Sequence, residues 1–340
     1  MIAEPALYPW LQTAFDHLDA LRRDDRVPGA LLIQGAEGLG KRSLALHFAA
    51  RLLCLEPFNP SPCGVCQGCH LFKAGTHPDL TTLEPEEVGK IIKVDQVRKV
   101  IQDLGLMSLY HGYRVIVIDP ADQMNQNAAN ALLKTLEEPA PKNLIILVTH
   151  RPHRLLATIR SRCQTLSIAR PKKDIALAFI KEKTTISSPE RLLSSAEGSP
   201  LRALEMAEKG LLGIRDQRFE AFSQVLKGQE DPVAMAQTWA EESPFETLDW
   251  VLSWLLDLVR LGLSDEAPAL LNEDLGEALK ELIKGLDVGE LIHYRDAVSG
   301  YRAQLETTAN RQLIFEAVLI RLSALSPYQR VAQRPKVASI

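Results

Sequence analysis

The stretch GALLIQGAEGLGKRSLALHFAARLL, residues 29–53, decides the fold class of this protein. Its early part, ALLIQ, is a short apolar run of strand length, whereas apolar residues recur at helical spacing after the glycines. The stretch therefore predicts a strand, a glycine-rich turn and a helix in succession. A phosphate-binding loop has this order, because the glycines let backbone N–H groups face an anion at the start of the helix.

Residues 35–42, GAEGLGKR, nearly match the phosphate-loop pattern G-x-x-x-x-G-K-[ST]. In the last position Arg42 replaces the Ser or Thr whose hydroxyl binds Mg²⁺, and a guanidinium only donates hydrogen bonds. From the loop alone, weak ATP binding and a glycine-rich turn without a ligand are equally acceptable interpretations. If phosphates bind, the residues that contact them are Gly35, Gly38, Gly40 and Lys41.

Further strands are predicted downstream of the loop, and helical segments separate them. The strands are DLTTLEP (79–85), RVIVIDP (114–120), NLIILVTH (143–150) and QTLSI (164–168), and a helix, QNAANALLKTLE (126–137), precedes NLIILVTH. This alternation predicts an α/β core with a doubly wound, largely parallel sheet. Functional groups in such sheets lie beyond the carboxyl ends of the strands, where Gly35, Asp119 and Thr149 fall.

The residues after the strand RVIVIDP argue against ATP hydrolysis. ATPases of this type have an Asp that holds Mg²⁺, followed by a Glu that orients the attacking water. Here Asp119 is followed by Pro120, which has no side-chain acceptor, and Asp122 is a poor substitute further along. Because Arg42 and Pro120 replace two groups that hydrolysis needs, we interpret the loop as the remnant of an ATPase site.

Four of the five cysteines cluster in CLEPFNPSPCGVCQGCH, with the spacing C-x8-C-x2-C-x2-C. Gly64 and Gly68 relieve the backbone in the tight turns between them. Four thiolates satisfy tetrahedral Zn²⁺ and leave no open position for chemistry, so we predict a structural zinc knuckle. A redox pair, free thiols and an Fe–S cluster are the alternatives, and His70 and His77 are possible competing ligands. The predicted ligands are Cys54, Cys63, Cys66 and Cys69.

Composition and charge argue against several functional classes. The net charge is −4, so contact with nucleic acid needs a local patch rather than a global basic field. The N-terminal MIAEPALYPW has no apolar core of a secretory signal, and no apolar run approaches the ~18 residues of a membrane helix. We therefore expect a cytoplasmic protein, where clustered thiols bind metal rather than form disulfides.

After about Ala169 the sequence becomes wholly helical. Short helical segments are predicted up to 209, and longer ones follow, with large core candidates at Trp239, Trp250 and Trp254. The tail has no periodicity and is expected to be disordered. The predicted divisions are an α/β core at 1–168, a small helical domain at 169–209, an all-α domain at 210–326 and the tail at 327–340.

Two later motifs resemble the clamp-loader branch of the AAA+ ATPases. They are NALLKTLEEP (130–139) and, some twenty residues later, ATIRSRC (157–163). A four-cysteine knuckle between the phosphate-loop helix and the second strand also resembles bacterial clamp loaders. The resemblance is strong over about 1–170, and over 210–340 it rests on helical character and length.

The resemblance implies an AAA+ core, a helical lid over 169–209 and a helical collar over 210–326 that joins subunits into a ring. It implies a non-hydrolysing subunit of a bacterial clamp loader, which loads the sliding clamp onto primed DNA. The implied partners are motor subunits and a delta-type subunit, with the sliding clamp and primer–template DNA contacted through the complex, and no membrane. Arg162 of Ser-Arg-Cys would be an arginine finger at a neighbour's ATP site.

Alternatives remain for the whole chain and for this arginine. A motor subunit that hydrolyses ATP is disfavoured by Arg42 and Pro120, although Lys41 is retained. A zinc-stabilised DNA-binding adaptor is disfavoured by the net charge of −4 and by the lack of aromatic–basic clusters. Without its motif, Arg162 would be interpreted as a salt-bridged surface residue. The basic segment 150–162 is expected to face either DNA phosphates or solvent.

Overall fold

The computed structural model describes residues 7–56, 59, 61–87, 90–105, 107–110, 112–264 and 268–326. The predicted disordered tail, 327–340, lies outside them. The chain divides into two compact units, which we call the sheet unit (1–179 with 199–202) and the helical unit (180–198 with 203–340). The finer divisions at 168 and 209 stay predictions.

A five-stranded sheet forms the centre of the sheet unit, in the order β2-β3-β4-β1-β5. Every neighbouring pair is parallel, which confirms the predicted parallel α/β core. The predicted strands are all present, some of them slightly shorter than expected. Their bounds are β1 Ala30–Gln34, β2 Leu80–Leu83, β3 Arg114–Ile118, β4 Asn143–Thr149 and β5 Gln164–Ser167.

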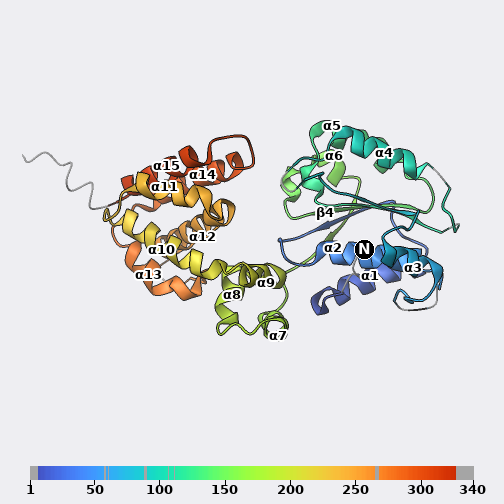
Figure 1. Ribbon diagram of the computed structural model, residues 1–340, viewed down its shortest axis with the longest axis horizontal. Helices are drawn as coiled ribbons and strands as arrows, with labels where there is room; N and C mark the ends of the chain where they lie inside the picture. Colours follow the sequence, from blue (N-terminus) through green and yellow to red (C-terminus); the bar gives the residue numbers. More distant parts are fainter. Residues whose placement is uncertain are drawn as a thin grey trace, which may run out of the picture. The chain divides into compact units, whose positions relative to one another are not determined.

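Helices cover both faces of this sheet (Figure 1). Successive strand residues point to opposite faces, so Leu31 and Ile33 of β1 join the apolar cluster of one face with Phe48, whereas Leu32 joins that of the other with Leu132. The first face carries η1 Pro9–Leu11, α1 Gln12–Arg23, α2 Lys41–Leu53 and α3 Gln67–Ala74. The second carries α4 Val94–Leu104, α5 Gln126–Glu137 and α6 Ala157–Arg160.

The predicted helix at 126–137 is confirmed, and local sequence explains both of its ends. The Asn125 side chain accepts a hydrogen bond from the N–H of Ala128 and caps α5. The helix ends at Glu137, two residues before Pro139, because the residue before a proline disfavours helical angles. Short 3-10 helices follow β3 and β4, namely η2 Ala121–Gln123 and η3 Pro152–Arg154.

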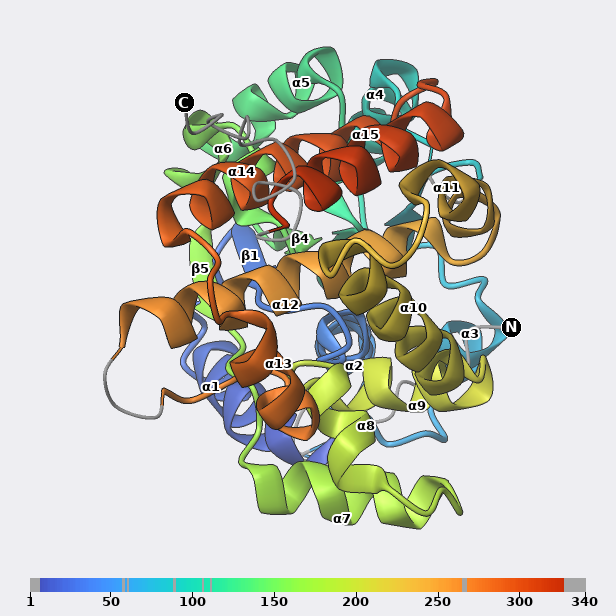
Figure 2. The ribbon, with the colours of Figure 1, turned by 90° about the vertical axis from the view of Figure 1, so that its left-hand side faces the viewer.

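The helical unit contains only helices among its described residues, as the sequence predicts. Trp239, Trp250 and Trp254 are all buried in its core, at 1%, 3% and 0% exposure. Within this unit, α11, α14 and α15 lie near one another (Figure 2). The helices are α8 Pro189–Ser195, α9 Pro200–Glu208, α10 Leu211–Leu226, α11 Pro232–Glu241, α12 Pro244–Leu263, η4 Glu273–Leu275, α13 Gly276–Leu282, α14 Val288–Gln304 and α15 Arg311–Ala324.

One further helix, α7 Lys173–Lys183, crosses the boundary between the units, as does the start of α9. Within the described part of the chain, no helix is both long enough and apolar enough to cross a bilayer.

Candidate nucleotide site and metal centre

The glycine-rich loop lies between β1 and α2, at the carboxyl edge of the sheet. Gly38 and Gly40 have φ angles of 73° and 79°, in the left-handed region that favours glycine, and Gly35 has a φ of 152°. A Cβ atom on Gly40 would lie 2.6 Å from the ring of Tyr8, so a larger residue could not fit there. The loop therefore has the backbone shape of a phosphate cradle.

Lys41 begins α2, but its ammonium group points back onto the loop itself. The side chain is buried, with only 7% of the residue exposed, and Nζ donates a hydrogen bond to the carbonyl oxygen of Ala36 at 2.5 Å. Burial lowers the pKa of Lys41, although the negative charges of Asp119 and Glu37 oppose that shift. A phosphate would offer this ammonium a charged acceptor in place of the carbonyl.

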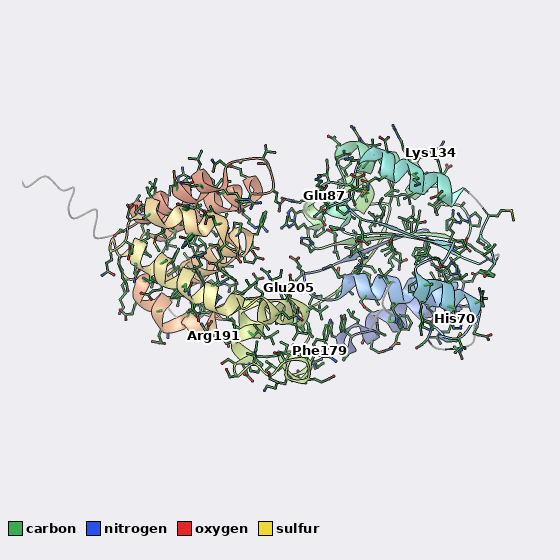
Figure 3. The ribbon with its side chains drawn as sticks, in the orientation of Figure 1. His70, Glu87, Lys134, Phe179, Arg191 and Glu205 are labelled. Carbon is green, nitrogen blue, oxygen red and sulfur yellow. The ribbon has the colours of Figure 1, made fainter. Side chains whose placement is uncertain are left out.

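Aromatic side chains of the N-terminal segment contact the loop. Trp10 Nε1 donates to the carbonyl of Leu39 at 2.9 Å, and the Trp10 ring stacks on Tyr8 with centroids 5.0 Å apart. Phe179 of α7, labelled in Figure 3, meets both rings edge-on at 5.6 Å and 5.0 Å. The aromatic group therefore packs with a specific geometry, and the hydrogen bond from Trp10 ties it directly to the loop.

Arg42 in the first turn of α2 pairs with two acids at the carboxyl ends of other strands. One guanidinium nitrogen donates to Asp119 Oδ2 at 3.3 Å, and the other donates to Glu84 Oε1. Glu84 and Asp119 directly follow β2 and β3, whose last paired residues are Leu83 and Ile118. The two carboxylates therefore lie side by side, and Arg42 bridges them.

The charge states of these groups follow from burial and from their pairing. Burial raises the pKa of Asp119, although the charge of Arg42 opposes that shift. Burial also disfavours charge on Arg42, but its hydrogen bond with Glu84 and the nearby charges outweigh this and raise its pKa. Arg42 is therefore a permanent cation at the strand ends.

Asp122, the weaker candidate for a catalytic acid, is engaged elsewhere. Thr149 Oγ1 donates to Asp122 Oδ1 at 2.5 Å, and the N–H of Arg151 donates to the same Thr149 oxygen at 2.9 Å. Thr149 closes β4, so this contact ties the segment after β3 to the end of β4. The Asp122 carboxylate thus contributes to local structure.

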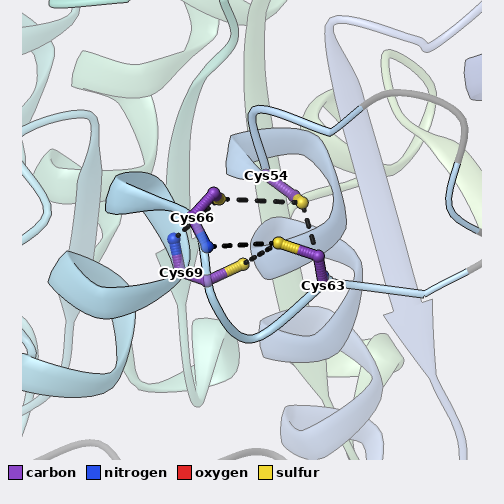
Figure 4. Close-up of side chains that lie close together, drawn as sticks. All are labelled: Cys54, Cys63, Cys66 and Cys69. Carbon is purple, nitrogen blue, oxygen red and sulfur yellow. Dashed lines mark hydrogen bonds between the residues drawn. The ribbon is translucent and has the colours of Figure 1, made fainter.

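The four cysteines converge into one cluster between α2 and α3 (Figure 4). Their sulfur atoms all lie within 4.8 Å of one another, with Cys54–Cys66 at 3.9 Å and Cys63–Cys69 at 3.8 Å. Four sulfurs at a Zn–S distance of about 2.3 Å in a regular tetrahedron would be about 3.8 Å apart. The cluster therefore has the size of a four-thiolate metal site, and these four residues could bind a metal ion.

Backbone contacts hold the cysteine cluster in shape. The N–H groups of Cys66 and Cys69 donate to the sulfurs of Cys63 and Cys66, at 3.3 Å and 3.4 Å. A Cβ atom on Gly68 would lie 2.3 Å from the carbonyl oxygen of Leu53, so only glycine lets α3 approach the end of α2 this closely. Burial raises the pKa of the Cys54 and Cys69 thiols, so a bound cation would be needed to hold both as thiolates at neutral pH.

The two nearby histidines lie outside this cluster. His77 is buried, and its Nδ1 accepts a hydrogen bond from the N–H of Asp79 at 3.1 Å. His70 lies on the exposed face of α3, as labelled in Figure 3. Among the described residues, the four cysteines alone form a group of three or more potential metal ligands.

Arg162, the predicted arginine finger, rests on the end of α5 within its own chain. Its Nε donates to Glu137 Oε1 at 2.8 Å, and another guanidinium nitrogen donates to the carbonyl of Thr158 at 3.0 Å. The side chain is 33% exposed. The guanidinium is therefore oriented but still accessible from solvent.

Sequence reasoning missed two partners that shape these sites. Glu84 follows β2 as Asp119 follows β3, so the same strand-end rule could have identified it. Glu137, the partner of Arg162, lies 25 residues away, and no local pattern marks it.

Comparisons with known proteins found matches to both units. The family described as "DNA polymerase III, delta subunit" matches residues 10–172, and "DNA polymerase III, delta subunit, C terminal" matches 209–324. DNA polymerase III subunit delta′ of Pseudomonas aeruginosa is 34% identical over 324 residues, 94% of this chain and 98% of the relative. The Escherichia coli protein of that name is 34% identical over 319 residues, 93% and 95% of the two chains. A crystal structure of a DNA polymerase III gamma-subunit-related protein from Thermotoga maritima is 20% identical, covers 92% of this chain and 99% of its own, and has a TM-score of 0.42.

Proposed function

This chain belongs to the DNA polymerase III delta′ subunit family, and from that premise we propose that it is a non-hydrolysing subunit of a clamp loader. The complex would place the sliding clamp on primed DNA in the bacterial cytoplasm. The observation that carries this proposal is similarity to a delta′ subunit along 94% of the chain. Both halves of the sequence match, so the similarity extends beyond the phosphate-loop core.

The residues at the strand ends disfavour ATP hydrolysis. A motor site needs a hydroxyl after Lys41 and an acceptor that orients water. Here Arg42 bridges Glu84 and Asp119, and Asp122 accepts a hydrogen bond from Thr149. These contacts favour a scaffold subunit over an ATP-hydrolysing motor subunit.

The four-cysteine cluster would hold a structural Zn²⁺. The tetrahedral sulfur spacing and the N–H groups that donate to sulfur support this ion. With four protein ligands no position is left for water or substrate, so the metal would stabilise the connection between α2 and α3. An Fe–S cluster would place sulfide between the cysteines and would need wider sulfur spacing.

Arg162 would act in trans on a neighbouring subunit. Its guanidinium is permanently charged and partly exposed, and its pairing with Glu137 is a contact that it would give up to reach a phosphate. A planar guanidinium suits the negative charge that spreads over the phosphoryl oxygens during transfer. The site in this chain would not use the finger, so the arginine would complete the ATP site of a motor subunit.

The domain roles follow the same proposal. Residues 169–209 would form the lid, and 210–326 the collar that binds motor subunits and a delta-type subunit. The test is co-purification of the full chain with the motor subunits, followed by a clamp-loading assay on primed DNA. We expect a stoichiometric complex whose loading rate depends on this chain. Binding of DNA by the isolated chain, with no affinity for motor subunits, would instead support a zinc-stabilised adaptor.

A further inference from the structure

Two carboxylates lie where a phosphate loop would need a divalent cation. β2 and β3 are parallel neighbours, and their final register pair is Leu83 with Ile118. The next residues, Glu84 and Asp119, therefore lie next to each other at the carboxyl edge. Mg²⁺ in phosphate sites is commonly held by one or two carboxylates, with water and phosphate oxygens filling the remaining positions.

In this chain a side chain occupies the place of that cation. Arg42 donates to Asp119 Oδ2 and to Glu84 Oε1 through two different guanidinium nitrogens. The guanidinium carries no acceptor, so it adds nothing to a metal's coordination sphere. It also places a fixed positive charge within hydrogen-bonding distance of both carboxylates, where it repels a second cation.

Arg42 supplies the positive charge that a metal would bring to the two carboxylates. Its charge and its hydrogen bonds act on both Glu84 and Asp119, whereas Lys41 lies near Asp119 but also near the negative charges of Glu37 and Asp122. A serine or threonine in place of Arg42 would remove the guanidinium that pairs with both carboxylates. The donor set of this chain therefore does not fit the Mg²⁺ ion that the fold normally uses.

We propose that Arg42 is a built-in cation that excludes divalent metal from Asp119 and Glu84. The proposal rests on the proposed function in one respect, since it gives the physical reason why this subunit does not hydrolyse ATP. It also predicts how this chain by itself binds divalent metal. One substitution, Arg42→Ser, should open a divalent-cation site that the wild-type chain lacks.

The experiment is a Mn²⁺ titration of the full, zinc-loaded chain, in which the electron paramagnetic resonance signal reports free Mn²⁺. Wild-type chain should show no binding that depends on Asp119. Arg42→Ser should gain one site, at least about tenfold tighter than any such binding in wild type, because two charge-assisted hydrogen bonds no longer compete. The double variant Arg42→Ser with Asp119→Asn should lose that site again.

Two further variants serve as a control and as a substitute in this titration. Arg98→Ser removes an exposed arginine that is ion-paired with Asp95 on α4, and it should leave Mn²⁺ binding unchanged. Arg42→Gln removes the charge but keeps side-chain length, so it serves if Arg42→Ser does not fold by circular dichroism. Asp119-dependent Mn²⁺ binding in wild type, or no gain in a folded Arg42 variant, would overturn the proposal. The titration needs no partner subunit, so it can fail while clamp-loader assembly succeeds, and the reverse also holds.

Discussion

Replacing Arg162 by Ala should leave the chain folded but lower the ATPase rate of a reconstituted clamp loader. The ion pair with Glu137 joins side chains that are 33% and 49% exposed. Exposed pairs of this kind contribute about 0–1 kcal/mol, so the free energy of unfolding should change by no more than that. Zinc content and assembly should stay intact.

The catalytic effect should be far larger than the effect on stability. Arginine fingers raise the rate of phosphoryl transfer by roughly 10³–10⁵ in GTPases, so the one ATP site that Arg162 completes should become nearly inactive. Sites completed by other subunits keep their own arginines, so the DNA-stimulated rate of the whole complex should fall only in part. Arg162→Lys should restore little, because an ammonium lacks the planar fork of a guanidinium.

Two matched variants distinguish the role of the Arg162 guanidinium from the effects of its neighbours. Glu137→Gln breaks the same ion pair but keeps the arginine, and it should not lower the rate, because the guanidinium must leave Glu137 to reach a phosphate. Arg160→Ala removes an exposed charge two residues away on α6 and should also have little effect. The assay is DNA-stimulated ATPase and clamp loading by complexes whose assembly is verified by size-exclusion chromatography. Equal rates for wild type and Arg162→Ala would refute the finger and leave Arg162 as a surface salt-bridge residue.

Further predictions concern the metal, the phosphate loop and the helical unit. Elemental analysis of protein purified without chelator should find one zinc per chain, and absence of zinc would contradict this. Chelation should loosen α3 while far-UV circular dichroism retains the sheet, because most of the apolar cluster on that face comes from the strands, α1 and α2, and α3 adds Phe72. The isolated chain should have no ATPase activity above background, and turnover that disappears in Lys41→Ala would show that the site was misinterpreted. Asp274→Asn should destabilise the helical unit by about 1–3 kcal/mol at pH 7, because the buried Arg215 loses its close carboxylate partner at 2.8 Å and keeps only the more distant Asp216 at 4.0 Å. Burial acts to raise the pKa of Asp274, but hydrogen bonds from Arg215 and Arg191 outweigh it and lower that pKa. Its contribution to stability is therefore present above the unfolded value of about 3.9 and is lost as the pH falls through the lower folded value. In urea denaturation, the difference in free energy of unfolding between wild type and Asp274→Asn should thus become smaller below about pH 4. A difference that does not depend on pH would contradict the role of this ion pair.

The sequence alone determined those features that depend on short segments. Residues 29–53 change from strand to helical periodicity, and the structure has β1, the loop and α2 at those places. Asn125 and Pro139 set the ends of α5 in the same local way. The cysteine spacing brings four sulfurs together because all four cysteines lie within one short segment, residues 54–69. In each case the neighbours in space are also neighbours in sequence, so periodicity and spacing carry the information.

Tertiary structure alone decided which charged groups meet. The chain makes β1, β2, β3 and β4 in sequence, but β4 inserts between β3 and β1 in the sheet. Arg42, which follows β1, therefore reaches acids 42 and 77 residues away in sequence, across the carboxyl edge. Arg162 meets Glu137 because α6 packs near α5. The strand-end rule can mark Glu84 and Asp119 individually, but their pairing with Arg42 depends on strand order and helix packing, which are set by burial of apolar surface over the whole unit.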